Sequence, residues 1–282
     1  MTRRKDLPDF RKPPVAETVL SLQFEPISGL TTAHIGLLWA RFRADFPTIE
    51  EHEPLPTAIE EFGRPSLPPV HVSIEQDRPL PRVWFISKTK TELIQVQSNR
   101  FIHNWRRYQG IEPYPHYDVV NRPNFNAEVA TFQKFLEDES LGPLKINQCE
   151  VAYVNHIEQA GVWETHSQFD KVFSVWNGGT SGSFLPKPED VAMQVRFVIP
   201  DGSGKPVGRL HVVAHPAWRR TDQMPIFVLN LTARGEPLGD GVNGAFAFLD
   251  LARDWIVKGF AELTRPEMHR VWERIQEDDT NR

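Results

Sequence analysis

Polar side chains recur at every second position in several segments that have the composition of β-strands. Alternate residues of a strand point to the same face, so each set would line one side of a sheet. Amide groups donate and accept hydrogen bonds without a fixed charge, which suits recognition of a small polar ligand or a peptide. The members are Gln95 and Gln97 in residues 92–97, Gln148, Glu150 and His156 in residues 146–157, and Gln194 and Arg196 in residues 191–199.

These polar sets have a second interpretation as an ordinary solvated surface, because an antiparallel sheet with one face in water shows the same alternation. The binding hypothesis requires the strands to lie in a common arrangement, with their polar residues lining one accessible recess. It fails if the glutamines of the three segments lie on unrelated parts of the surface.

The segment NRFIHNWRR, residues 99–107, gathers amides, cations and an indole directly after the first glutamine-rich strand. Its candidate ligand contacts are Arg100, Asn104, Trp105 and Arg106. An arginine beside a tryptophan could stack on a nucleobase or hold a phosphate. In the structural alternative, the segment is a strand end whose aromatic and aliphatic side chains pack inward while its arginines face water.

No residue is assigned a catalytic role. Glu150 and His156 would share a strand face, but a rise of about 3.3 Å per residue places them about 20 Å apart. His211 and His215 would lie about 13 Å apart, which is too far for one zinc ion. Cys149 has the opposite parity to its polar neighbours, which indicates a buried and unreactive thiol. We therefore expect neither a metal nor a cofactor.

Apolar periodicity predicts the order of strands and helices, with a period of two for strands and a spacing of i, i+3, i+4 and i+7 for helices. The acidic, proline-rich residues 48–68 are expected to form a long connection. Helix starts are expected at Asn124 and at the capping-box patterns of Thr165 with Gln168 and Thr264 with Glu267. The predicted strands are 15–24, 70–74, 82–87, 92–97, 146–157, 191–199, 207–214 and 226–233, and the predicted helices are 32–46, 124–136, 165–176, 244–263 and one after 264.

Each half of the chain then reads strand, helix, three strands, helix. This order predicts an α+β fold of two similar β-α-β-β-β-α halves, with a largely antiparallel sheet and helices packed on one face. The expected parts are an N-terminal lead (1–14), a first half (15–140), a second half (146–265) and a C-terminal helix and tail (266–282). We expect the halves to form one compact unit by duplication; the alternative is a single α+β domain whose halves are similar by coincidence.

Several motifs span nearly the whole chain. They are PPVAETVLSLQFEP (13–26), HIGLLWARFRADFP (34–47), ELIQVQSNRFIHNWRR (92–107), INQCEVAYVNHI (146–157) and LTRPEMHRVWER (263–274). With these motifs the chain resembles a sporadically distributed family of uncharacterised bacterial proteins. The resemblance implies a bacterial cytoplasmic protein and supplies no activity. The patchy distribution of the family points to mobile genes, such as toxin–antitoxin or phage-defence neighbourhoods.

Bulk composition narrows the classes of partner. The net charge of −5 gives no global basic field, so nucleic acid is not an expected partner. A single cysteine rules out an intramolecular disulfide, and no apolar stretch approaches the ~18 residues of a membrane span. These features predict a cytoplasmic protein that does not enter the membrane.

The sequence therefore predicts a non-enzymatic binding or regulatory protein. It would recognise a partner protein or a small polar ligand through the polar strand faces. Alternatively, the last helix would present Met268, Trp272 and Ile275 to a protein partner. A different class is an enzyme or effector acting on a nucleotide or nucleic acid through the tryptophan–arginine motif, which requires Glu17 or Glu150 to lie beside Arg100 or Arg106 in a cleft. A third possibility is a structural protein that self-associates through its last helix.

Overall fold

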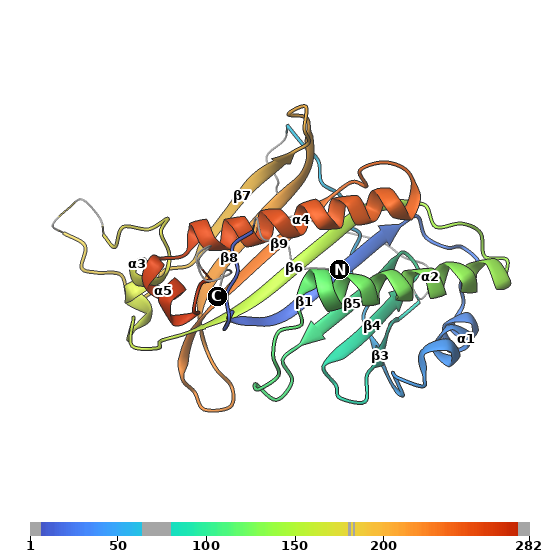
Figure 1. Ribbon diagram of the computed structural model, residues 1–282, viewed down its shortest axis with the longest axis horizontal. Coiled ribbons are helices and arrows are strands. Elements are labelled where there is room, and N and C mark those ends of the chain that lie inside the picture. Colours follow the sequence, from blue (N-terminus) through green and yellow to red (C-terminus); the bar gives the residue numbers. More distant parts are fainter. Residues whose placement is uncertain (1–6, 64–79, 180–181, 183, 276–282) are drawn as a thin grey trace.

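Strands that are apolar on one side dominate the described part of the chain. The computed structural model describes residues 7–63, 80–179, 182 and 184–275. Within these residues, nine strands form one sheet in the order β2-β3-β4-β5-β1-β6-β9-β8-β7, and all neighbouring pairs are antiparallel (Figure 1). The strands are β1 (Val15–Phe24), β2 (Thr48–His52), β3 (Arg82–Ile86), β4 (Glu92–Gln97), β5 (Arg100–Arg106), β6 (Ile146–Glu158), β7 (Met193–Pro200), β8 (Pro206–Trp218) and β9 (Pro225–Gly235).

The first strand of each half lies at the centre of the sheet. β1 pairs with β6, and each of them pairs on its other side with the last strand of its own half, β5 or β9. The two halves therefore share one continuous sheet and repeat the same connectivity, except that the first half has the additional edge strand β2. The predicted α+β class and antiparallel sheet are confirmed; duplication of the halves stays a prediction.

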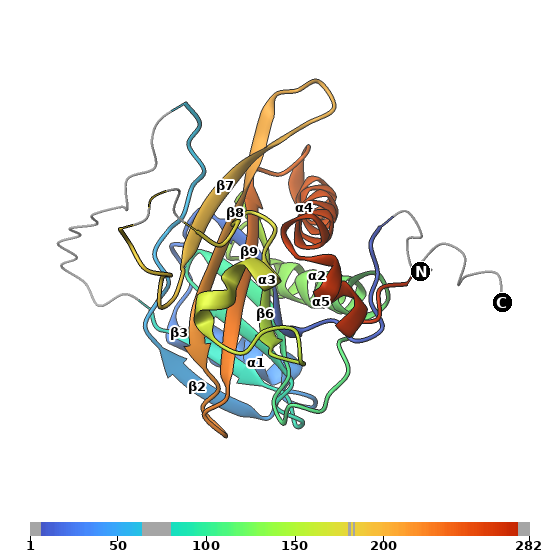
Figure 2. The same ribbon diagram turned by 90° about the vertical axis from the view of Figure 1, so that its left-hand side faces the viewer.

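Two long helices cover one face of the sheet. Figures 1 and 2 show α2 and α4 side by side on that face, while α3 and α5 lie together at one end of the molecule. The described helices are α1 (Thr32–Phe42), α2 (Arg122–Asp138), α3 (Phe169–Val172), α4 (Gly241–Leu263) and α5 (Pro266–Val271), with a π-helical turn at Tyr117–Asn121 and a 3-10 turn at His166–Gln168.

The core lies between the sheet and these helices. Phe132 of α2 stacks on Phe101 of β5 with ring centroids 4.7 Å apart, and both side chains are fully buried. Under α4, Gly208 and Gly235 lie opposite each other on β8 and β9. A Cβ atom at Gly235 would lie 2.2 Å from the carbonyl oxygen of Val207 and 2.5 Å from the ring of Phe248. Glycine at this position therefore lets α4 approach the sheet closely.

The predicted connection 48–68 is wrong in its first part. Residues Thr48–His52 form the edge strand β2, and residues 53–63 then follow the face of the sheet opposite to α2 and α4 (Figure 2). β2 is exposed along most of its length, so its sequence TIEEH lacks the apolar alternation that identified the other strands. The predicted strand 70–74 lies outside the described residues.

Helix starts are less accurate than strand positions. α2 begins at Arg122 after the π-helical turn, two residues before the predicted cap Asn124. The capping box of Thr165 and Gln168 is confirmed, but the helical structure after it ends at Val172, so the predicted helix to 176 is too long. Thr264 does not cap α5: the helix begins at Pro266 with Arg265 at the N-cap position, and the Thr264 hydroxyl donates to the carbonyl of Phe260. The start of α2 differs by two residues, which is within the usual spread of helix ends, whereas the end of the short α3 differs by four residues.

The C-terminal helix belongs to the core. Met268 and Trp272 are buried, and the Trp272 ring lies 4.9 Å from Phe260 and 6.0 Å from Phe10. Phe10 pairs with Arg274 in an antiparallel bridge, which ties the N-terminal lead to the residues that follow this helix. The prediction that Met268, Trp272 and Ile275 are presented to a partner is therefore wrong, because Met268 and Trp272 are buried within the chain's own core.

Candidate functional site

The strand register places the predicted polar residues on one face of the sheet, opposite to α2 and α4. From β4 to β6, Gln97 lies opposite Arg100, Arg100 opposite Gln23, and Gln23 opposite Gln148. Residues that lie directly opposite in antiparallel strands point to the same side. We call this surface the polar face; it includes Glu17, Gln23, Gln95, Gln97, Arg100, Asn104, Gln148, Glu150, Gln194, Arg196, Arg209, His211, Asn230, Thr232 and Arg234.

The second half extends the polar face to the far edge of the sheet. Glu150 lies opposite Arg234, and Arg234 opposite Arg209. Arg196 and Gln194 share this face, but they lie on the exposed edge strand β7. The register therefore brings all the predicted glutamines to one face, while it leaves Gln194 at the side of the sheet away from Gln97.

A segment of the chain itself crosses the polar face. We call residues 55–62 the crossing segment; they follow β2 and run over the strands on the side away from the helices (Figure 2). The Leu55 amide donates to Gln97 Oε1 at 2.9 Å, and Gln97 Nε2 donates back to the Leu55 carbonyl at 3.0 Å. The Ala58 amide donates to Gln23 Oε1 at 2.9 Å. Glutamine side chains of the sheet therefore hold the backbone of this segment.

Arg100 and Asn99 add contacts to the middle of the crossing segment. Arg100 Nη2 donates to the Pro56 carbonyl at 3.0 Å and also to the side chain of Gln23. Asn99 Nδ2 donates to the Thr57 hydroxyl at 3.0 Å. Burial lowers the pKa of Arg100, while the nearby Glu150 carboxylate acts in the opposite direction. This arginine is thus a buried cation bound to neutral oxygen atoms.

Glu60 anchors the end of the crossing segment. Its side chain is 4% exposed and forms an ion pair with Arg209, a contact of 2.6 Å with His211 Nε2 and a contact of 3.5 Å with Arg234 Nη1. Arg209 also donates to the carbonyl of the next residue, Glu61, at 2.9 Å. We call Glu60, Arg209, His211 and Arg234 the carboxylate cluster.

The carboxylate cluster keeps Glu60 ionised. Burial alone would raise the pKa of Glu60, but the hydrogen bond and charge of His211 and the charges of Arg234 and Arg209 together lower it. Arg234 is shared, because it also contacts Glu150 at 2.5 Å. Two arginines thus face two carboxylates, and the placement of Arg209, His211 and Arg234 around Glu60 is suited to holding one carboxylate.

Gln95 and Asn104 belong to a buried network of side-chain hydrogen bonds. Gln95 Nε2 donates to Asn104 Oδ1 at 2.6 Å and Arg82 Nη1 donates to Gln95 Oε1 at 2.9 Å. Asn104 Nδ2 in turn donates to Glu17 Oε1 at 2.6 Å. Burial raises the pKa of Glu17, opposed by the Asn104 hydrogen bond and by the charge of Arg106, which lies opposite on β5. Both amides therefore have structural partners within the face, and their role in ligand contact stays a prediction.

Trp105 does not belong to the polar face. Its alternation with Asn104 and Arg106 turns it toward the helices, where it is 4% exposed and its ring lies 5.8 Å from Tyr114. Arg106 lies on the opposite face and donates to the Lys90 carbonyl. The predicted pairing of Trp105 with Arg106 around one base or phosphate is therefore wrong, although the acidic residue Glu17 does lie opposite Arg106 as the nucleotide hypothesis required.

Sequence reasoning missed the most heavily contacted part of the site. Glu60 lies in the proline-rich connection, where no periodicity marks it, and Arg209 was not selected. Arg209 has the parity of His211, as Arg234 has that of Thr232, so strand parity was the signal that could have found it. His156, which was selected, keeps an exposed side chain near the end of β6, and partial desolvation together with the charge of Arg107 lowers its pKa.

The centre of the polar face is partly exposed. Val19, Val154, Val213, Asn230 and Thr232 each retain partial exposure, although they lie in central or near-central strands. This part, which we call the open part, consists of aliphatic side chains, the hydroxyl of Thr232 and the amide of Asn230, whose Oδ1 is buried and has no hydrogen-bond partner among the described residues. Such a surface offers apolar contact together with hydrogen bonds, as protein interfaces do.

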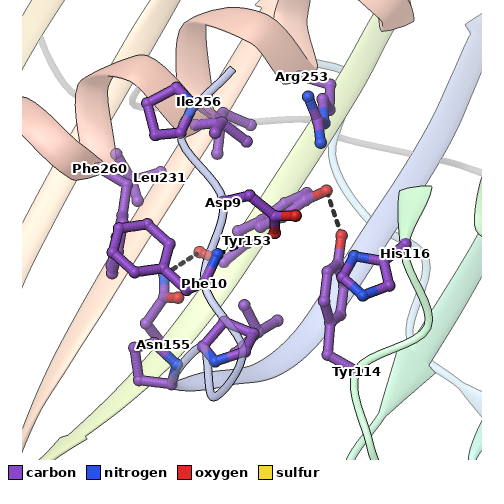
Figure 3. Close-up of a pocket in the computed structure, with 15 residues that line it drawn as sticks. Asp9, Phe10, Tyr114, His116, Tyr153, Asn155, Leu231, Arg253, Ile256 and Phe260 are labelled. Atoms are coloured by element: carbon purple, nitrogen blue, oxygen red, sulfur yellow. Dashed lines mark hydrogen bonds between the residues drawn. The ribbon is translucent and has the colours of Figure 1, made fainter. Parts of the chain in front are cut away.

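A small cavity lies on the other side of the sheet. Figure 3 shows it between the N-terminal lead, Tyr114, Tyr153 of β6 and Arg253 of α4. The two tyrosine hydroxyls are 2.7 Å apart, and Arg253 Nε and Nη1 have no hydrogen-bond partner among the described residues. Its volume is about 50 Å³, room for only a few atoms. Asp9 and Asp118 lie near the guanidinium, so the cavity has no excess of positive charge for an anion.

Two further findings bear on the class of site. In the part of the chain that the structure describes, no three or more His, Cys, Asp or Glu side chains gather where they could hold a metal ion. No described helix has the length and apolar character needed to cross a bilayer.

Comparison with models of known protein families gives no match, and no curated protein is significantly similar in sequence to this chain. What the site can bind therefore follows from its geometry.

Proposed function

We propose that this protein is a non-enzymatic binding protein that recognises a partner protein through the polar face. The observation that supports this most directly is the crossing segment, because it demonstrates that side chains of the face can hold a stretch of polypeptide by its backbone. Extended peptides are commonly recognised through main-chain hydrogen bonds, with pockets for individual side chains. The open part, next to this segment, offers additional area for contact.

The cellular setting of this function is also a proposal. The sequence resemblance supports a bacterial cytoplasmic protein and a toxin–antitoxin or phage-defence context. The equal connectivity of the two halves supports an origin by duplication, which would explain why polar rows of both halves meet on one face. The alternative of a nucleotide-directed effector loses its main support, because Trp105 and Arg106 lie on opposite faces.

The proposal is tested by affinity capture from the host with quantitative mass spectrometry. Val154→Arg adds a long cation to the open part, whereas Leu37→Arg adds the same side chain to the exposed face of α1, where Leu37 is 51% exposed. We expect a protein that is enriched by the wild type and by Leu37→Arg and is lost with Val154→Arg. Equal capture by all three chains, or no enriched protein with any, would overturn the proposal.

A further inference from the structure

The crossing segment has the features of a bound ligand. Most of its contacts to the sheet involve backbone atoms, which are the same in any peptide: the amides of Leu55, Ala58 and Glu60, and the carbonyls of Leu55, Pro56 and Glu61. The one charged side chain of the segment that the face buries is that of Glu60. The sheet therefore requires an extended chain and one carboxylate.

The dimensions of the segment agree with an extended chain that crosses the strands. Its partners run from Gln97 on β4 to Arg209 on β8, five strand spacings apart in the sheet order. Strands lie about 4.8 Å apart, so the span is about 24 Å. The six steps from Leu55 to Glu61 reach about 20 Å when extended, and the long arginine side chain covers the rest. A folded or helical segment would be too short to reach both ends.

Charge decides which peptide fits. Arg209 and Arg234 contact Glu60, and Arg234 also contacts Glu150. Removing Glu60 would leave the buried Arg209 without a described carboxylate partner, which is costly unless another carboxylate replaces it. An acidic side chain on an incoming peptide restores the pair, whereas a neutral one does not.

We propose that the polar face is a docking surface for an extended peptide of a partner protein that places a carboxylate in the carboxylate cluster, and that the crossing segment is the chain's own competitor for this surface. This inference rests on the proposed function and names the chemistry of the partner. The incoming peptide displaces residues 55–62, takes over the backbone contacts of Gln97 and Gln23, and pairs its acidic side chain with Arg209.

Competition sets the affinity that such a partner shows. A tethered segment is present at an effective concentration of order millimolar, and a ligand binds only the fraction of molecules from which the segment has detached. Weakening the attachment of the segment therefore strengthens binding of a peptide added in solution. Glu60→Gln weakens the segment and leaves every residue of the face intact.

The test measures binding of a fluorescent synthetic peptide with the sequence of residues 53–63, EPLPTAIEEFG, to the full-length protein by fluorescence anisotropy. Loss of a charge-assisted hydrogen bond changes an equilibrium about 10- to 100-fold, so Glu60→Gln is expected to bind the peptide that much more tightly than the wild type does. Glu53→Gln removes an exposed carboxylate just before the crossing segment and is expected to match the wild type. A peptide with glutamine at the position of Glu60 is expected to bind more weakly.

Two outcomes would overturn the inference. The first is equal peptide affinity for the wild type and Glu60→Gln, provided that circular dichroism shows both chains folded. The second is dimerisation of Glu60→Gln by exchange of its segment, seen by analytical ultracentrifugation, which would make a second copy the occupant. In a further variant, Glu60→Gln combined with Arg209→Gln is expected to lose peptide binding. The capture experiment with Val154→Arg does not depend on these results, so failure of the docking mode and failure of the proposed function are distinguishable.

Discussion

Arg209→Met isolates the contribution of the carboxylate cluster to holding the crossing segment. The Arg209 side chain is 11% exposed, pairs with Glu60, donates to the Glu61 carbonyl at 2.9 Å and lies 5.0 Å from the ring centre of Phe62. Breaking a buried ion pair costs about 3–5 kcal/mol. Glu60 keeps His211 and Arg234 as partners in the variant, so we expect a somewhat smaller loss than this, about 2–4 kcal/mol, in the free energy of opening the segment.

Native-state hydrogen exchange measures this opening directly. The amides of Leu55, Ala58 and Glu60 donate to sheet side chains, and their exchange in Arg209→Met should accelerate about 30- to 1,000-fold. Arg219→Met is the control, because Arg219 pairs with Glu158 and Asp222 at a partly exposed site, where ion pairs contribute about 0–1 kcal/mol.

A double-mutant cycle with Glu60→Gln completes the test. Residues in direct contact show interaction energies of about 0.5–3 kcal/mol, and a value in the upper half of this range is expected for Arg209 and Glu60. Additivity of the two substitutions within about 0.5 kcal/mol would refute the reasoning. Equal acceleration of exchange throughout the central strands would also refute it, since the segment is expected to open while the sheet stays folded.

Three further predictions concern the helix-covered side of the sheet. Gly235→Ala should lower the free energy of unfolding by about 1–3 kcal/mol or more in urea, because its Cβ would overlap a backbone oxygen at 2.2 Å, whereas Gly202→Ala, with open space around it, should be nearly neutral. Burial would lower the pKa of His103, but the Glu128 carboxylate, 3.0 Å away, raises it above its ordinary value. The contribution of this pair to the free energy of unfolding is therefore complete below about pH 6.5 and is lost as the pH rises through the folded pKa of His103. A flat profile of stability between pH 5 and 9, or an unaltered profile in Glu128→Gln, would contradict this. Burial raises the pKa of the Cys149 thiol far above its ordinary range, so a thiol reagent should modify it only at the rate of unfolding, and rapid modification of the native protein would show that β6 opens locally.

Strand periodicity was sufficient to predict most of the sheet. β1 and β4 have the predicted bounds, and the glutamines of three segments share one face because a period of two fixes side-chain direction once strands pair. Which strands become neighbours depends on contacts between distant segments, and for this reason the sequence could not show that Gln194 lies at an edge. Trp105 was assigned to the site for its chemistry, although its parity with Phe101 already placed it among the core residues.

The crossing segment could not be predicted by the same reasoning. Its residues follow no period, because its backbone hydrogen bonds go to side chains of the sheet and not to a neighbouring strand. Prolines at 54 and 56 also suggest a simple connection, since proline gives up a backbone donor. The ion pair of Glu60 with Arg209 fixes the end of this segment on the sheet, and the pair could not be predicted because Arg209 lies in the other half of the chain.

The central pairing of β1 with β6 has a consequence for how the chain is made. The first half leaves the ribosome with β1 flanked on one side by β5 and open on the other, since the neighbour of that edge has not yet been synthesised. Contacts between distant segments slow folding, and an open edge strand can pair with another molecule in the meantime. Expression of residues 1–140 alone would make that exposure permanent, so such a fragment should aggregate unless the second half is supplied.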